Sequence, residues 1–85
     1  MIDYRYQTFL ILADSLDYAK TAQELCLSKP AVTQHIHYLE TDLEVKLFQN
    51  QGGNLVLTKK GQLLKNRLIV INEHIDDLLR SLASK

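Results

Sequence analysis

Apolar residues recur at intervals of three and four along the first third of the chain, which is the spacing of one face of an α-helix. From residue 4 to about residue 15 this face consists of Tyr6, Phe9, Leu10 and Ala13. From residue 17 to about residue 25 it consists of Tyr18, Ala22 and Leu25. Asp3 and Asp17 stand at the starts of these segments and are good N-caps. The pattern predicts two short helices.

The stretch "LSKPAVTQHIHYLE", residues 27–40, predicts a third helix with two different faces. Ser28 is a suitable N-cap, and Pro30 falls in the first turn, where its missing N–H costs nothing. One face is apolar and consists of Val32, Ile36, Leu39 and Leu43. The opposite face is uncharged and consists of Pro30, Thr33, Gln34, His37 and Thr41. Because a solvated face usually carries Lys and Glu, this second face favours hydrogen bonding to a ligand.

A β-hairpin is predicted after the third helix. Two runs of strand-forming residues, Lys46–Phe48 and Leu55–Leu57, flank the sequence "QNQGGN". Gly52, Gly53 and Asn54 tolerate positive φ, as a tight turn requires. Leu47, Phe48, Leu55 and Leu57 are expected to cover the core.

A long helix is predicted from Lys59 to about Ala83, with Thr58 as its N-cap and Gly61 in its first turn. Its apolar residues are spaced four, three, four, three and four apart, and they are Leu64, Leu68, Ile71, Ile75, Leu78 and Leu82. This is a heptad seam, which on a monomer would be an exposed apolar stripe. The seam predicts a homodimer held together by this helix.

Composition fits one small cytoplasmic domain. The chain has 85 residues, 46% of them apolar, and no apolar run approaches the ~18–20 residues of a membrane span. Cys26 is the single cysteine, so no internal disulfide can form, and we interpret it as a small packing residue. The formal net charge is zero, which argues mildly against nucleic acid, because phosphate neutralisation supplies much of that affinity.

The second and third helices with the "CLS" turn between them form a helix-turn-helix pattern from Tyr18 to His37. In that motif the second helix lies in the major groove of DNA. Gln can bond adenine, Thr offers a hydroxyl and a methyl, and Lys can reach guanine. The helix pattern alone is equally compatible with a simple three-helix bundle whose outer face is only exposed to solvent. The hairpin that follows favours a winged helix, whose tip could lie along a phosphate backbone or be structural.

Catalysis, metals and cofactors find little support in the sequence. His35 and His37 are two residues apart on a helix, so their side chains diverge by about 200° and cannot share a metal. No glycine-rich phosphate loop follows a strand. We therefore expect no enzyme activity, no metal site and no cofactor.

The segments "DYAKTAQELCLSKPAVTQHIHYLETDLEVKLF" and "LVLTKKG" together resemble the N-terminal domain of LysR-type transcriptional regulators. Members typically read Phe-x-x-Ala-Ala-x-x-Leu, Ser-Gln-Pro-Ala-Leu/Val-Ser, Gln-x-Ile-x-x-Leu-Glu, Gly-Val-x-Leu-Phe-x-Arg and Leu-Thr-x-x-Gly. The match covers residues 1 to about 61, and the long helix resembles the linker helix of the family. This implies a mainly α winged helix-turn-helix domain at residues 1–58, followed by a dimerisation helix at residues 59–85.

The resemblance also implies roles for matching positions. Base contacts are expected from Lys29, Pro30, Thr33, Gln34 and His37. Backbone contacts are expected from Ser28, Lys20, Asn50, Gly52, Gly53, Lys59 and Lys60, with the Thr33 hydroxyl as a further candidate. Antiparallel packing of the linker helices implies a two-fold dimer on an inverted-repeat site. Members usually carry an effector-sensing domain after the linker helix, and we expect none in this chain.

Three positions depart from the family pattern. Asn50 replaces a usual arginine, Glu44 a usual glycine, and Asp17 a common serine. With the zero net charge, these changes predict weaker nonspecific DNA binding than a basic relative would show. The alternative function is a winged-helix dimer that binds proteins and not DNA. The discriminating feature is whether Lys20, Lys29, Lys46, Lys59 and Lys60 gather on one face, away from Glu24, Glu40, Asp42 and Glu44.

Overall fold

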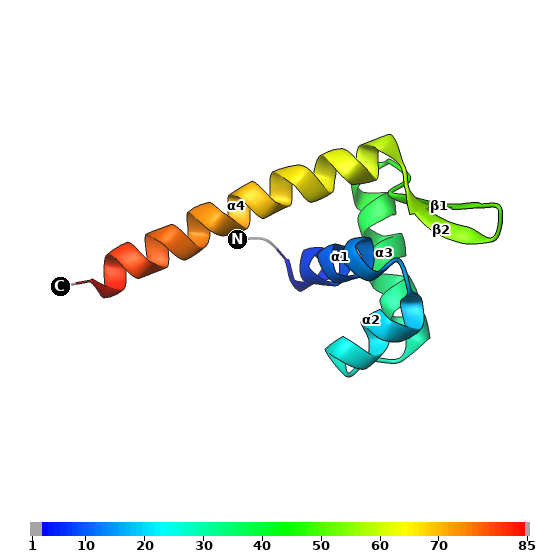
Figure 1. Ribbon diagram of the computed structural model, residues 1–85, viewed down its shortest axis with the longest axis horizontal. Coiled ribbons are helices and arrows are strands. Elements are labelled where there is room, and N and C mark those ends of the chain that lie inside the picture. The colour runs from blue at the N-terminus through cyan, green and yellow to red at the C-terminus, as the bar shows by residue number, and fades with distance from the viewer. Residues whose placement is uncertain (1–2, 85) are drawn as a thin grey trace.

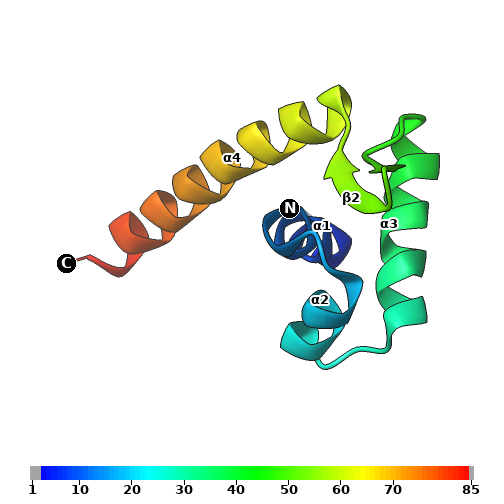
Figure 2. The ribbon, with the colours of Figure 1, turned by 45° about the vertical axis from the view of Figure 1, so that its right-hand side comes forward.

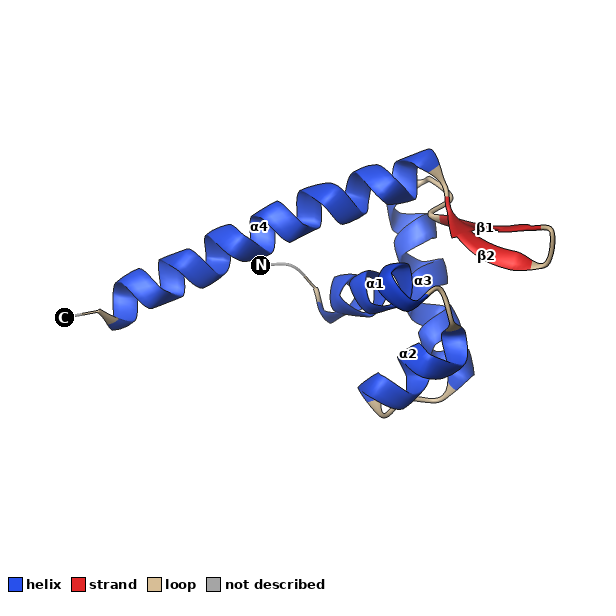
Figure 3. Cartoon of the chain, in the orientation of Figure 1, coloured by secondary structure: helices blue, strands red, loops and turns tan. Residues whose placement is uncertain are grey.

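A computed structural model describes residues 3–84, which form four helices and one two-stranded hairpin (Figures 1 and 3). The elements in chain order are α1 (Tyr4–Ser15), α2 (Tyr18–Leu25), α3 (Lys29–Leu43), β1 (Phe48–Gln51), β2 (Asn54–Leu57) and α4 (Lys59–Ala83). The predicted order of three helices, a hairpin and a long helix is confirmed, and with it the mainly α winged helix-turn-helix fold. None of the helices in this range is both long enough and apolar enough to span a lipid bilayer.

Each helix begins at a side chain that accepts a hydrogen bond from the first turn. The backbone N–H groups of Arg5, Lys20, Ala31 and Gly61 donate to the caps Asp3, Asp17, Ser28 and Thr58 over 2.9–3.2 Å. The predicted N-caps are therefore confirmed.

Three helices end on a residue in the left-handed conformation. These residues are Leu16, Cys26 and Glu44, with φ between 54° and 57°. Cys26 is exposed, so its interpretation as a packing residue is wrong, and it acts as the C-cap of α2. Glu44 adopts the backbone conformation that the glycine of the family pattern would adopt without strain.

The hairpin is present, but its first strand lies further along than predicted. Phe48 pairs with Leu57 and Gln51 with Asn54, so most of the expected tip is strand. Only Gly52 and Gly53 form the turn, and their φ values of 59° and 83° suit a type I′ turn.

Lys46 and Leu47 stay outside the ladder because the backbone of Leu47 bonds elsewhere. Its N–H donates to the Glu40 carboxylate over 2.7 Å, and its carbonyl accepts from the N–H of Thr58 over 3.0 Å. The segment before β1 is thus fixed between α3 and the start of α4.

The core lies between α1, α3, the hairpin and the first half of α4. Its buried members are Phe9, Leu12, Ala13, Ile36, Leu39, Leu47, Phe48 and Leu68. The rings of Phe9 and Phe48 lie 5.5 Å apart between centroids. Gly61 lets α4 approach this core, because a Cβ there would overlap the carbonyl oxygen of Leu47. The predicted α3 stripe of Val32, Ile36 and Leu39 is confirmed as buried.

Beyond its first half, α4 projects away from the other elements (Figure 1). The molecule therefore extends over 52 × 27 × 21 Å. Several large apolar side chains in the middle and in the projecting part of α4 are exposed: Ile69, Val70, Ile71, Leu78, Leu79 and Leu82.

Candidate nucleic-acid interface

The side of α3 opposite its buried stripe forms a continuous surface without charge. Its residues are Thr33, Gln34, His37, Tyr38 and Thr41, which line one shallow hollow and are all exposed. We call these five residues the outer face. In Figure 2, α3 stands at the edge of the molecule with no other element on its outer side. A flat ligand edge or a groove can therefore approach these side chains directly.

The outer face offers different hydrogen-bonding groups along its length. Gln34 presents an amide with a donor and an acceptor in one plane. The Thr33 hydroxyl donates to the Lys29 carbonyl over 3.1 Å, so towards a ligand it offers lone pairs and a methyl group. His37 contributes an imidazole one turn after Thr33. Tyr38 also belongs to this face but was missed, because the sequence gives no sign that an aromatic residue beside the core stripe stays exposed.

A second hollow separates the start of α3 from the hairpin. Lys29 and Thr33 line it from α3, while Asn50 and Gly53 line it from the hairpin. Asp17 of the α2 N-terminus also lines this hollow and accepts the backbone N–H of Lys20. Predicted base-contact and wing residues are thus brought together here, with one ammonium and one carboxylate among them.

The remaining predicted backbone contacts are all exposed, namely Ser28, Lys20, Gly52, Lys59 and Lys60, and so is Pro30 at the α3 N-terminus. Lys46 lines a hollow with Glu40 and Glu44, and Lys60 lines an apolar groove with Leu43 and Leu63. Lys29, Lys46 and Lys60 therefore line three different hollows.

Glu40 fixes the hairpin against α3. Its carboxylate accepts the backbone N–H groups of Leu47 over 2.7 Å and Phe48 over 3.3 Å. Burial raises the pKa of Tyr18, and the Glu40 carboxylate is the second, smaller cause of that increase. Glu40 is half-buried, and it also lines a surface hollow with His37 and Thr41 of the outer face.

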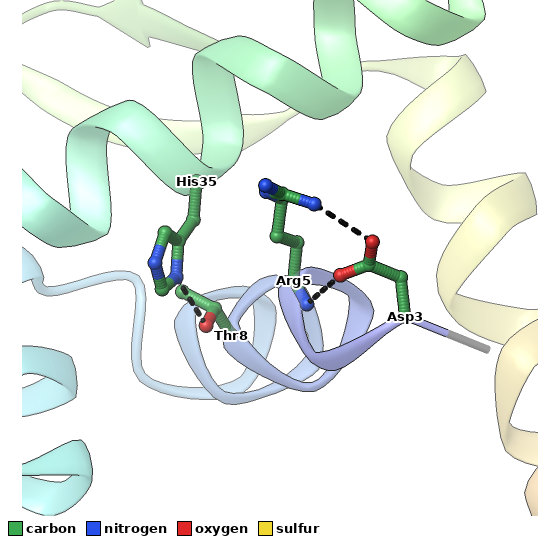
Figure 4. A network of polar contacts seen from close by, with 4 residues as sticks. All are labelled: Asp3, Arg5, Thr8 and His35. Atoms are coloured by element: carbon green, nitrogen blue, oxygen red, sulfur yellow. Dashed lines mark hydrogen bonds and ion pairs between the residues drawn. The ribbon is translucent and has the colours of Figure 1, made fainter.

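The side of α3 towards α1 carries a polar network, shown in Figure 4. His35 Nδ1 lies 2.9 Å from the Thr8 hydroxyl, so His35 faces α1 while His37 belongs to the outer face. Arg5 pairs with Asp3 at 2.7 Å, and its guanidinium carbon lies 3.9 Å from the ring centre of Tyr38. The pKa of nearby Tyr6 is raised, mainly by burial and to a smaller extent by the carboxylates of Asp42 and Asp3.

The predicted dimer seam on α4 divides into two parts. Leu68 is only 3% exposed and belongs to the core, with Leu64 packed beside it. Leu64 and Leu68 were expected to face a second chain, but in the structure they pack against the core of their own domain. Four-and-three spacing arises equally when a helix packs on its own domain. Ile75 is half-buried, while Ile71, Leu78 and Leu82 are exposed.

Residues 4–62 match a sequence family described as "Bacterial regulatory helix-turn-helix protein, lysR family". A curated relative, the uncharacterized HTH-type transcriptional regulator YxjO of Bacillus subtilis, is 42% identical over 57 residues. That alignment covers 67% of this chain and 20% of YxjO. The chain thus spans about a fifth of the length of this relative, which is a transcriptional regulator and not an enzyme.

Two solved structures are also similar to this one. A crystal structure of a LysR-family transcriptional regulator from Eggerthella lenta is 43% identical, with a TM-score of 0.77. The matched region covers 80% of this chain and 97% of the Eggerthella lenta chain. The structure of a CbnR_DBD–DNA complex is 25% identical, with a TM-score of 0.76, and covers 99% of this chain and 100% of that one.

Proposed function

This chain belongs to the lysR family of bacterial regulatory helix-turn-helix proteins, and on that premise we propose that it binds double-stranded DNA and regulates transcription. The observation that carries the proposal is the outer face of α3. It exposes uncharged hydrogen-bonding side chains beside a hairpin in the position of a wing. The nearest charges at its C-terminal end are Glu40, Glu44 and Lys46, which share a hollow with His37 and Thr41. An α-helix with such a face fits the major groove, which displays donors and acceptors on base edges. The similarity to a protein solved as a DNA complex supports the same function.

Gln34 is our principal candidate for reading a base. Its amide matches the N7 acceptor and N6 donor of adenine. Thr33 is better suited to a thymine methyl or a donor on DNA, because its own proton bonds Lys29. Lys29, Pro30 and His37 complete the proposed set of base contacts, with Lys29 and Pro30 at the N-terminal end that enters the groove first.

Backbone contacts are proposed for the exposed groups around α3. Ser28 and Lys20 lie at the starts of α3 and α2, while Asn50, Gly52 and Gly53 belong to the hairpin. Lys59 and Lys60 open α4. Each phosphate that one of these lysines neutralises should add about 0.9 to the slope of log affinity against log salt.

We further propose that two chains associate through α4. The exposed apolar residues in the middle and in the projecting part of α4 would leave water in such a dimer. A mainly apolar groove lies at the other end of α4 and is lined by Leu43, Val45, Leu47, Leu63 and Leu64, together with Lys60 and Arg67. Antiparallel helices would bring the projecting end of one chain to the groove of the other. Residues 1–58 would then contact DNA, and the helix from residue 59 would join the chains, giving a two-fold dimer on an inverted repeat.

A protein-interaction module remains the second candidate function. It is favoured by the zero net charge and by the separation of Lys29, Lys46 and Lys60 into three hollows. DNA binding is the stronger proposal because the outer face itself carries no carboxylate. A regulator of bacterial transcription would act in the cytoplasm.

Selection from random duplex DNA separates the two candidates. The purified chain should enrich a common motif with two inverted half-sites, and a fluorescent duplex of that motif should bind with strong salt dependence. A pool without enrichment, together with equal weak binding of all duplexes, would refute the DNA-binding proposal.

A further inference from the structure

The outer face of α3 has two flanks, and they differ in chemistry. On one flank Lys29 and Thr33 line the hollow shared with Asn50 and Gly53 of the hairpin. The other flank faces α1, where Tyr38 meets Arg5. A helix in the major groove runs between two phosphate backbones, since the groove is about 12 Å wide. The wing serves one of these backbones, so the α1 flank is placed to meet the other.

Arg5 is held in a fixed position on this flank. Its guanidinium carbon lies 3.9 Å from the ring centre of Tyr38 and 4.8 Å from that of Tyr4, both within cation–π range. Asp3 forms an ion pair with one of its terminal nitrogens over 2.7 Å. A cation–π contact uses no hydrogen-bond donor, so the guanidinium N–H groups that Asp3 does not bind stay available for another ligand.

The free hydrogen-bond donors of Arg5 and Tyr38 reach solvent. Within residues 3–84, the Arg5 side chain makes no hydrogen bond other than that to Asp3, and the Tyr38 hydroxyl makes none. No side-chain nitrogen or oxygen in this range is buried without a partner. The Arg5 side chain is 24% exposed and Tyr38 is 47% exposed. Both residues therefore present unused donors at the edge of the outer face.

We propose that Arg5 and Tyr38 form a phosphate-binding pair on the α1 flank, on the opposite side of α3 from the wing. This inference rests on the proposed DNA-binding function. Guanidinium groups bind phosphate through parallel N–H donors, and the cation–π contact with Tyr38 orders Arg5 before DNA arrives. The Tyr38 hydroxyl supplies a further donor to the same strand.

Asp3 both supports and opposes this pair. Its carboxylate caps α1 and pairs with Arg5, yet its negative charge repels a phosphate. Asn caps helices about as well as Asp, so Asp3→Asn removes the charge while keeping the cap. The variant should bind DNA several-fold more tightly.

The test compares Arg5→Gln with Arg80→Gln in titrations of a fluorescent duplex at 50 and 200 mM salt. Arg80 is a matched control, because it also pairs with an aspartate, Asp77 at 3.4 Å, but lies near the far end of α4. One lost phosphate contact should flatten the slope by about 0.9, so the wild type loses about 3.5-fold more affinity than Arg5→Gln across this salt step. Arg80→Gln should keep the wild-type slope.

A merely structural Arg5 would give a different result. Arg5→Gln would then unfold at a lower temperature but keep the wild-type salt slope, which would overturn the proposal. If Arg5→Gln does not fold, Tyr38→Phe and Asp3→Asn replace it, with Asp77→Asn as the control for Asp3→Asn. If Tyr38→Phe and Asp3→Asn both bind DNA as the wild type does, the proposed phosphate-binding pair is equally overturned. Absence of salt-dependent binding by the wild type would instead refute the proposed function itself.

Discussion

Leu68→Ala and Leu78→Ala separate the two roles that the apolar seam of α4 combines. Leu68 is 3% exposed within the core cluster, while Leu78 is 57% exposed on the projecting part of the helix. Replacing a buried leucine by alanine removes its transfer free energy and leaves a cavity, which together cost about 2–5 kcal/mol. Leu78 is less than half buried in the monomer, so its replacement should lower the free energy of unfolding by at most about 1 kcal/mol.

The free energy of unfolding that Leu68→Ala is expected to remove is large for a domain of this size. At about 0.05–0.15 kcal/mol per residue, a chain of 85 residues has roughly 4–13 kcal/mol of stability in total. Leu68→Ala should therefore lower the melting temperature by about 8 °C or more. Leu78→Ala should leave the monomer close to wild type and weaken its association.

Urea unfolding followed by circular dichroism at several protein concentrations tests both expectations. A loss of core packing lowers the midpoint equally at every concentration, whereas a loss of association makes the change depend on concentration. Sedimentation of the folded variants gives their dimer dissociation constants. The argument fails if Leu68→Ala weakens association without lowering the stability of the monomer, or if Leu78→Ala destabilises the monomer as much as Leu68→Ala.

Four further predictions concern binding, assembly and the end of α3. Gln34→Ala should cost about 1–3 kcal/mol on the selected site and much less on random DNA, and competition with single-base variants should show relaxed preference at one base pair per half-site. Alanine at both Lys59 and Lys60 should weaken all duplexes about equally and flatten the salt slope, whereas a changed sequence preference would contradict their assignment to phosphate. Ile75→Asp should convert a dimer to monomers in sedimentation, and a wild type that is already monomeric at tens of micromolar would contradict the dimer proposal. Glu44→Gly should raise the free energy of unfolding by about 1 kcal/mol in urea titration, because Glu44 has a φ of 57°.

Local rules were sufficient to predict the helices from the sequence. The caps at Asp3, Asp17, Ser28 and Thr58 each satisfy an N–H group within the next turn, so their effect is independent of distant residues. The outer positions of α3 were predictable for the same reason, since the buried stripe fixes which side turns outward.

Features that depend on distant partners were beyond such rules. The first strand was misplaced because Leu47 bonds Glu40 and Thr58 instead of the opposite strand. Leu68 was assigned to a dimer because spacing does not distinguish one apolar neighbour from another. Arg5 gained its place beside the outer face only through Tyr38, which lies 33 positions later in the chain.

The zero net charge of the chain says less about DNA binding than its composition suggests. Asp3, Asp17 and Glu40 each accept backbone N–H groups, so these carboxylates serve the fold wherever the chain binds. Placing a carboxylate on such donors offsets part of its field, because the donors carry partial positive charge. The outer face of α3 itself holds no carboxylate, while each flank carries a cation beside a carboxylate, Lys29 with Asp17 on the wing flank and Arg5 with Asp3 on the α1 flank. The field that a phosphate backbone would meet is therefore set by these few side chains, and a count over all residues averages them with charges that serve the fold.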